Sequence, residues 1–194
     1  MSTKKSMRNM GISGLITLIL IFLDQITKWL AVEKLSKGEP FVLIKNVFEL
    51  QYLENQSAAF GIDLVTIFQN IFKLEYFENN PAAFLRAKMI FFIVITNLVT
   101  IFLCFLYRKI PSTPRFRWLN VTMVLFVSGA IGNLIDRIVN NYVVDFFYFK
   151  LINFPIFNVA DIYVTVGAFL FIFLCLFVYR EEDFEVIFPK KSLD

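Results

Sequence analysis

Four long apolar segments separated by polar connections dominate the pattern of the chain. Each has close to the 20 or so apolar residues that a transmembrane helix needs. The predicted spans are residues 11–31, 89–107, 118–139 and 160–179. The first follows a basic tail, as a signal peptide would, but its long apolar run and the poor cleavage site at residues 31–33 favour a retained span.

The connection between the first two spans, about residues 38–87, has a different pattern. Residues 41–44 and 47–53 are rich in apolar and aromatic side chains with partial alternation, which predicts two short strands. The stretch 46–60 recurs 24 residues later, at 70–84. This recurrence is either a chance echo or a second strand and turn of the same type.

Lysine and arginine residues near the spans predict the orientation, because short cytoplasmic segments carry an excess of both. Three segments show that excess: the N-terminal tail (Lys4, Lys5, Arg8), the connection between spans two and three (Arg108, Lys109, Arg115, Arg117) and the C-terminal tail (Arg180, Lys190, Lys191). We therefore expect both termini in the cytoplasm and a small periplasmic or extracellular β element. The predicted fold class is an all-α membrane protein, in which residues 1–194 form a single polytopic membrane domain.

Composition narrows the chemistry. Hydrophobic residues make up 58% of the chain and phenylalanine contributes 25 of its residues, far too apolar for a soluble domain. A net charge of +3 does not indicate a nucleic-acid partner. The sequence has no histidine, which excludes His-ligated zinc and His general bases. Cys104 and Cys175 lie inside apolar runs and are read as packing residues. We therefore expect no metal and no cofactor.

Four carboxylates are expected near the outer membrane interface. Asp24, Asp136 and Asp161 lie 16 to 19 residues from the inner ends of their spans. At a helical rise of about 1.5 Å per residue, that is a depth of roughly 24–28 Å. Asp145 sits in the outer connection. Ionisable groups at such positions are costly and are therefore candidates for function.

The neighbours of these carboxylates separate them into two pairs. Asp24 has Lys28 one helical turn away, and Asp136 is followed by Arg137, so both acids are read as ionised and structural. Asp145 has apolar neighbours, which should raise its pKa. Asp161 opens a span, where a helix N-terminus favours the charged form.

One carboxyl group that favours the protonated form and one that favours the charged form suit general acid–base catalysis with a single water molecule. The alternative is that Asp161 is only a helix N-cap and Asp145 only a loop residue.

Small and amide side chains complete the set of candidates. Ser128 and Gly132 form a small-xxx-small pair that lets another helix approach closely. Asn55, Asn133 and Asn158 lie at or near membrane depth, where each needs a hydrogen-bond partner in the protein or in a substrate.

Five blocks, in this order, resemble the bacterial lipoprotein signal peptidases, also called type II signal peptidases. They are Asp24-Gln25-Ile26-Thr27-Lys28, Asn55-Gln56-Ser57-Ala58-Ala59-Phe60, Gly129-Ala130-Ile131-Gly132-Asn133-Leu134-Ile135-Asp136-Arg137, Val143-Val144-Asp145-Phe146, and Phe154-Pro155-Ile156-Phe157-Asn158-Val159-Ala160-Asp161. Ser57 and Ser128 replace glycines that are usual in the family. Ser57 is expected to stiffen the turn that carries Asn55. Asn79 in the second copy competes with Asn55 for the family role, and we favour Asn55.

The resemblance implies an intramembrane aspartic endopeptidase that removes the signal peptide from diacylglyceryl-modified prolipoproteins, cleaving before the lipidated cysteine. It implies Asp145 and Asp161 as the catalytic pair. The supporting or substrate-contacting residues that it implies are Asp24, Lys28, Asn55, Asn133, Asp136, Arg137 and Asn158. The expected location is the bacterial inner membrane, with the active site at the outer face.

The expected partners are lipidated signal peptides and membrane lipid, with the protein as a monomer. The main alternative is a proton- or cation-coupled transporter, which predicts acids spread along a path across the bilayer. A non-catalytic membrane scaffold is a second alternative, but it does not explain why Asp145 and Asp161 are present.

Overall fold

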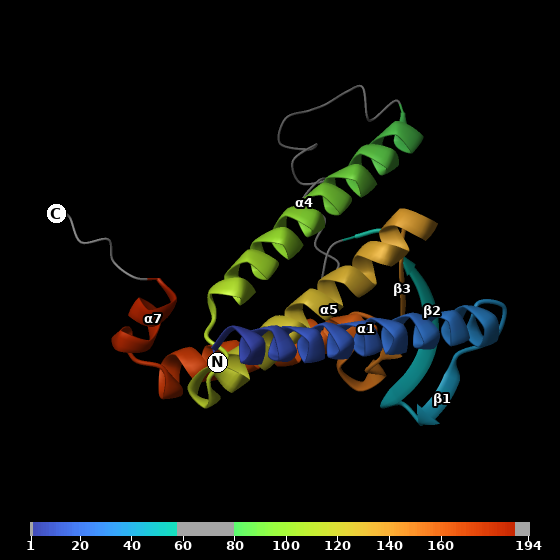
Figure 1. The fold of residues 1–194 in the computed structure, drawn as a ribbon. Coiled ribbons are helices and arrows are strands. Elements are labelled where there is room, and N and C mark those ends of the chain that lie inside the picture. Colours follow the sequence, from blue (N-terminus) through green and yellow to red (C-terminus); the bar gives the residue numbers. More distant parts are fainter. Residues whose placement is uncertain (1, 58–79, 189–194) are drawn as a thin grey trace.

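Four long helices form the body of the protein in the computed structural model, which describes residues 2–57 and 80–188, with side chains from residue 11 onward (Figure 1). They are α1 (Ser2–Leu35), α4 (Pro81–Lys109), α5 (Arg117–Asn140) and α6 (Val159–Phe173). Each of the four expected spans falls in a helix that is long and apolar enough to cross a membrane. Only 11% to 44% of each most apolar window is buried in the protein, which leaves broad apolar faces for lipid.

The second of these helices begins earlier than the expected span. It starts at Pro81 rather than near Met89, and the backbone N–H of Phe84 already donates to Asn80. Proline suits a first helical turn because its missing N–H would have no partner there. The end of the second copy of the repeated stretch is therefore the start of a helix. Most of that copy, including Asn79, lies outside the described residues.

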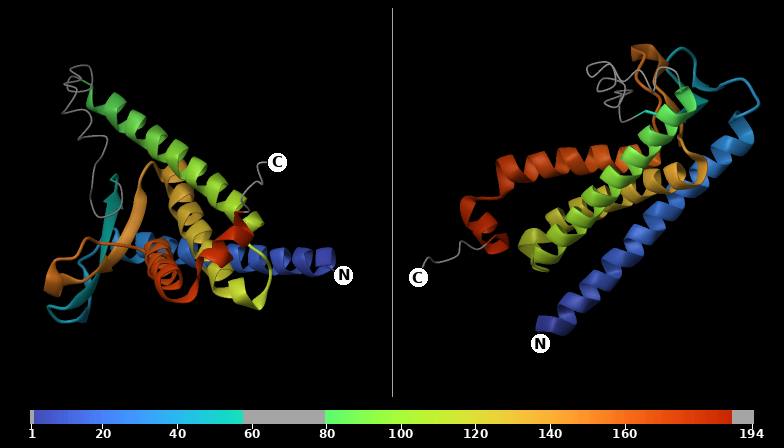
Figure 2. Two further views of the ribbon diagram at one scale, coloured as in Figure 1. Left: turned by 90° about the vertical axis from the view of Figure 1, so that its left-hand side faces the viewer. Right: turned by 90° about the horizontal axis from the view of Figure 1, so that it is seen from above.

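A three-stranded antiparallel sheet lies at one end of the helices (Figure 2). Its strands are β1 (Phe41–Ile44), β2 (Phe48–Asn55) and β3 (Val143–Tyr148), in the order β1-β2-β3. The two strands expected from the sequence are confirmed. The register between β2 and β3 pairs Leu53 with Asp145 and Asn55 with Val143. Asn55 and Asp145 are therefore diagonal neighbours across the two strands.

The third strand was not predicted, because its sequence was read as part of an outer connection. Its first four residues, 143–146, are all buried, so the strand lacks the alternation of apolar and polar positions that marks a half-exposed strand. Strand β3 pairs with β2 along one edge, and its contacts with helices α1 and α5 add to its burial. That burial is what removes Asp145 from water.

Helix α5 is the centre of the bundle and contacts α1, α4 and α6. A Cβ atom on Gly129 would lie 2.6 Å from the Ala160 carbonyl oxygen of α6, and one on Gly132 would lie 2.6 Å from an Asp24 carboxylate oxygen of α1. Both distances are too short for a side chain, so these glycines set how closely the helices approach. Ser128 is fully buried, and its hydroxyl donates to the Val124 carbonyl at 2.7 Å.

At the opposite end of the bundle, the chain after α6 contacts the connection that precedes α5. A π-helical turn, η4 (Leu174–Val178), continues α6, and a short helix, α7 (Glu181–Ile187), follows. Arg115, in the 3₁₀ turn η2 (Pro114–Phe116), binds Asp183 of α7 through two nitrogens, at 2.6 and 3.0 Å. This pair holds the pKa of Asp183 at about 2, and it joins α7 to the connection before α5.

Candidate active site

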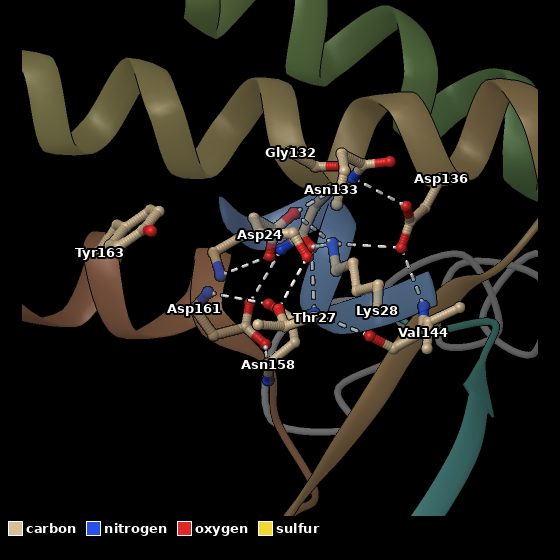
Figure 3. Close-up of polar contacts among 12 residues, drawn as sticks. Asp24, Thr27, Lys28, Gly132, Asn133, Asp136, Val144, Asn158, Asp161 and Tyr163 are labelled. Carbon is tan, nitrogen blue, oxygen red and sulfur yellow. Dashed lines mark hydrogen bonds and ion pairs between the residues drawn. The ribbon is translucent and has the colours of Figure 1, made fainter. Parts of the chain in front are cut away.

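The predicted site residues come from five elements and meet where the helices reach the sheet. Figure 3 shows the part of the site formed by α1, α5 and the start of α6. Helix α1 supplies Asp24 and Lys28, and α5 supplies Asn133 and Asp136. Strand β2 supplies Asn55, strand β3 supplies Asp145, and the start of α6 supplies Asn158 and Asp161. These eight of the nine predicted residues are joined by hydrogen bonds or ion pairs, so the structure brings together residues that are far apart in the sequence. The ninth, Arg137, also lies on α5 and donates to the Asn133 carbonyl at 3.4 Å.

A buried lysine lies between two carboxylates from different helices. Lys28 Nζ lies 2.9 Å from Asp24 Oδ2 and 3.1 Å from Asp136 Oδ2, and it also donates to Asn133 Oδ1 at 2.9 Å. The side chains of all three charged residues are at most 3% exposed. Removing Lys28 would leave two buried carboxylates without the cation between them, which is strongly destabilising.

The pairing expected from the sequence is confirmed for Asp24 and wrong for Asp136. Asp136 binds Lys28 rather than its neighbour Arg137, because consecutive residues on a helix point in different directions. The Arg137 guanidinium instead lies over the ring of Phe92 of α4, 5.2 Å from its centre. The charge of Arg137 interacts with Asp161, Asp145 and Asp136.

The two structural carboxylates also hold the backbone of the elements that carry the other two. Asp24 Oδ1 accepts a hydrogen bond from the backbone N–H of Ala160, at the start of α6, at 2.8 Å. Asp136 Oδ2 accepts one from the backbone N–H of Val144 in β3 at 3.0 Å. Each bond fixes the residue next to Asp161 or Asp145 relative to a membrane helix.

Asp161 lies in the first turn of α6, where the sequence left open that it is only a helix N-cap. The N-cap itself is Asn158, so reading Asp161 as the N-cap is wrong. Asn158 Oδ1 accepts from the Asp161 N–H at 3.0 Å, and Asp161 Oδ2 accepts from the Asn158 N–H at 3.1 Å, which is a reciprocal capping box. The second carboxylate oxygen of Asp161 accepts from Asn133 Nδ2 at 2.9 Å.

Asp145 is 1% exposed and is held by two amides. Its Oδ2 accepts from Asn55 Nδ2 at 2.7 Å, and its Oδ1 accepts from Asn158 Nδ2 at 2.6 Å. Burial, and then the neighbouring charge of Asp161, raise the pKa of Asp145 to about 7, although both amide donors act in the opposite direction. The direction agrees with the expectation from its apolar neighbours in the sequence.

Asn158 is the residue that links the two carboxylates. It is fully buried, its amide nitrogen donates to Asp145, and its amide oxygen and backbone N–H bind Asp161. The same nitrogen also lies 3.1 Å from Asn133 Oδ1. One residue, through its side chain and its backbone N–H, thus holds both acids in a single hydrogen-bonded unit at the junction of β3 and α6.

The turn after β2 accepts serine without strain. The backbone N–H of Ser57 donates to Asn55 Oδ1 at 2.8 Å, which leaves the Asn55 amide nitrogen free to donate to Asp145. Ser57 is not among the non-glycine residues with positive φ in the described chain. The turn at this point therefore does not require the glycine that is usual in the family.

Gln25 and Thr27 were not singled out in the sequence, although both lie in the first motif block. Gln25 Nε2 is 3.1 Å from Asp24 Oδ2, from Asp136 Oδ1 and from the Gly132 carbonyl. The Thr27 hydroxyl donates to the Asp24 carbonyl at 2.8 Å. Their polar character inside an apolar span was the available signal. Within residues 11–57 and 80–188, no three Asp, Glu, Cys or His side chains form a group that could hold a metal ion.

Comparison with known proteins gives a consistent result. A family model described as signal peptidase (SPase) II matches residues 16–66 and 62–177. The lipoprotein signal peptidase of Clostridium tetani is 39% identical over 175 residues, which cover 88% of this chain and 94% of the relative. That of Streptococcus pneumoniae is 34% identical over 177 residues, covering 91% and 97%.

Two solved structures, each described as a bacterial membrane enzyme, share the fold. One has a TM-score of 0.64 at 26% identity and covers 94% of this chain and 93% of its own. The other has a TM-score of 0.63 at 28% identity and covers 87% and 95%. Fold, site and relatives together define a multi-pass membrane peptidase. Within that class, the chain belongs to the signal peptidase II family.

Proposed function

We propose that this protein is an intramembrane aspartic endopeptidase that removes the signal peptide from diacylglyceryl-modified prolipoproteins, cleaving before the lipidated cysteine. Asp145 and Asp161 are its catalytic pair. The observation that carries this proposal is that Asn158 binds both carboxylates. Its side-chain amide nitrogen donates to Asp145 Oδ1 and its backbone N–H donates to Asp161 Oδ2. The membership of the chain in the signal peptidase II family supports the substrate class.

The mechanism follows from the electrostatics of the pair. Two carboxylates in one buried unit do not both ionise easily, so the pair shares one proton. A pKa of about 7 for Asp145 supports Asp145 as the protonated member near neutral pH. The ionised carboxylate takes a proton from water, whose oxygen attacks the scissile carbonyl carbon, while the protonated carboxyl donates a hydrogen bond to the carbonyl oxygen. A proton then passes to the leaving amine as the C–N bond breaks.

The setting of the reaction is the outer face of the bacterial inner membrane. The basic residues at the opposite end of the bundle support an orientation with that end in the cytoplasm. The sheet and the carboxylates then lie where water meets the bilayer. The substrate enters sideways from the bilayer, with its acyl chains among the lipid-facing side chains. The working unit is a monomer, since one chain supplies every residue of the unit described above.

The transporter alternative predicts acids spread along a path through the membrane. In the described part of the chain, the four aspartates Asp24, Asp136, Asp145 and Asp161 instead gather in one hydrogen-bonded region where the helices meet the sheet. This clustering does not fit a transport path across the bilayer.

A peptidase assay on the purified protein in detergent tests the catalytic pair. Asp145→Asn and Asp161→Asn should each lower turnover of a lipidated prolipoprotein on the order of 10²–10⁴-fold, because each removes an acid or base from the reaction. Glu33→Gln removes an exposed carboxylate of α1 and is the matched control with unchanged turnover.

An unlipidated prolipoprotein, tested beside the lipidated one, should be cleaved poorly by the unmodified protein. Circular dichroism should show the same helix content in all variants. Normal cleavage by folded Asp145→Asn would contradict the proposed pair.

A further inference from the structure

A groove between α1 and α5 lies at the end of the bundle away from the sheet. Its volume is about 580 Å³, and it is lined by one face of α1, by the connection between α4 and α5, and by the first turns of α5. The two helices approach most closely near the sheet, where Gly132 meets Asp24. They separate toward the connection, as Figure 2 shows, and the residues that line the groove lie on both sides of that opening.

The groove is polar at one end and apolar at the other. Ser13, Thr113 and Arg117 line it near the connection, whereas Leu20 and Leu125 line it further toward the centre of the bundle. Leu20 is seven residues beyond Ser13 on α1, and Leu125 is eight residues beyond Arg117 on α5. At about 1.5 Å per residue, the apolar part extends roughly 10–12 Å into the membrane-spanning region.

The polar end carries one cation with no protein partner among the described side chains. Arg117 is exposed, and within residues 11–57 and 80–188 its guanidinium forms no hydrogen bond or ion pair. The neighbouring hydroxyls of Ser112 and Thr113 also line this end. A planar guanidinium beside hydroxyl donors matches the geometry of a phosphate group.

We propose that this groove binds an anionic glycerophospholipid of the cytoplasmic leaflet. Its phosphate contacts Arg117 and the adjacent hydroxyls, and one acyl chain lies along the α1 and α5 faces that end at Leu20 and Leu125. Arg117 lies at the mouth of the apolar groove, so the groove favours a lipid with a net negative charge over a zwitterionic lipid. The site is separate from the carboxylates, which lie at the other end of these helices.

Binding of such a lipid stabilises the folded protein, because the lipid occupies a groove that exists only when α1 and α5 are packed. Native mass spectrometry of the full chain in detergent, titrated with phosphatidylglycerol, measures the affinity directly. Phosphatidylcholine with the same acyl chains is the comparison lipid. We expect several-fold tighter binding of phosphatidylglycerol, and a higher unfolding temperature with it than with phosphatidylcholine.

Three variants separate a built site from general attraction to basic residues. Arg117→Gln should weaken phosphatidylglycerol binding about tenfold, the loss of one charge-assisted contact. Val121→Trp should weaken it by filling the groove with a bulky ring. Arg108→Gln removes the same charge from an exposed position at the same end of the bundle but not from the groove lining, and should bind like the unmodified protein.

Equal weakening by Arg108→Gln and Arg117→Gln would overturn the proposal, because it would show diffuse attraction. Equal binding of the two lipids would also overturn it. If Val121→Trp left lipid binding unchanged but raised the KM for a lipidated prolipoprotein, the groove would belong to the substrate and not to a phospholipid.

Discussion

At the scale of single residues, Asn55 lowers the pKa of Asp145 through a hydrogen bond to its carboxylate. Its amide donates to Asp145 at 2.7 Å, and this bond favours the charged carboxylate. Ser57 holds the Asn55 amide in that orientation through its backbone N–H. In the proposed mechanism, Asn55 therefore acts through the pKa of Asp145.

Asn55→Ala should shift the pH dependence of peptidase activity. Loss of the donor raises the pKa of Asp145 above about 7, so the limb of the profile that reports ionisation of Asp145 should move to higher pH. One hydrogen bond to a charged group corresponds to a shift of about one pH unit. Activity measured from pH 5 to 9 tests this shift.

The matched control is Asn97→Ala, which removes an exposed amide of α4 that only binds its own helix. Its profile should coincide with that of the unmodified protein. A lower rate with an unmoved profile for Asn55→Ala would show that Asn55 has a structural role alone.

At the scale of elements, the placement of Asp161 depends on how closely α6 packs on α5. That distance is set by Gly129, whose missing side chain leaves room for the Ala160 carbonyl and the Val164 side chain. Because Ala160 also donates to Asp24, the start of α6 is fixed from two helices. The acid is positioned by packing as much as by its own hydrogen bonds.

Gly129→Ala should destabilise the protein by about 1–3 kcal/mol, since the added methyl meets a backbone atom that cannot move freely. Peptidase activity should fall with it, because α6 carries Asp161. Gly14→Ala is the control, since nothing lies within 4 Å of a Cβ there and alanine favours the helix. Thermal unfolding in detergent distinguishes the two, and an unchanged midpoint for Gly129→Ala would refute the packing argument.

At the scale of the whole molecule, the two ends differ in charge and chemistry. The sheet and the buried carboxylates form one end, while Arg115, Arg117 and the short α7 helix form the other. The expected orientation puts the second end in the cytoplasm, because basic residues are retained on that side during insertion. Both termini then lie inside the cell.

Substituted cysteines test this orientation in a chain whose Cys104 and Cys175 are replaced by serine. Lys37→Cys, in the exposed turn before β1, should react with a membrane-impermeant maleimide in cells with an intact inner membrane. Glu182→Cys, in α7, should react only after the membrane is opened. Reaction of Glu182→Cys in intact cells would reverse the predicted topology.

The sequence by itself determined the four membrane helices, two of the three strands and most of the polar residues that form the site, Gln25 and Thr27 excepted. These are local properties: the length of an apolar run, the spacing of a strand, and the cost of a charge within a span. The motif blocks added the expected roles of Asp145 and Asp161. Both acids do lie in one hydrogen-bonded unit, although their catalytic roles stay a prediction until the assay is done.

Only the tertiary structure decided which partners meet. Asp136 binds Lys28 rather than the adjacent Arg137, Asn158 rather than Asp161 is the N-cap, and β3 is a strand whose buried faces hide its period. Such pairings depend on the angles and distances between elements far apart in the chain. Local sequence does not determine these pairings, because the same side chains could face several partners until the helices pack.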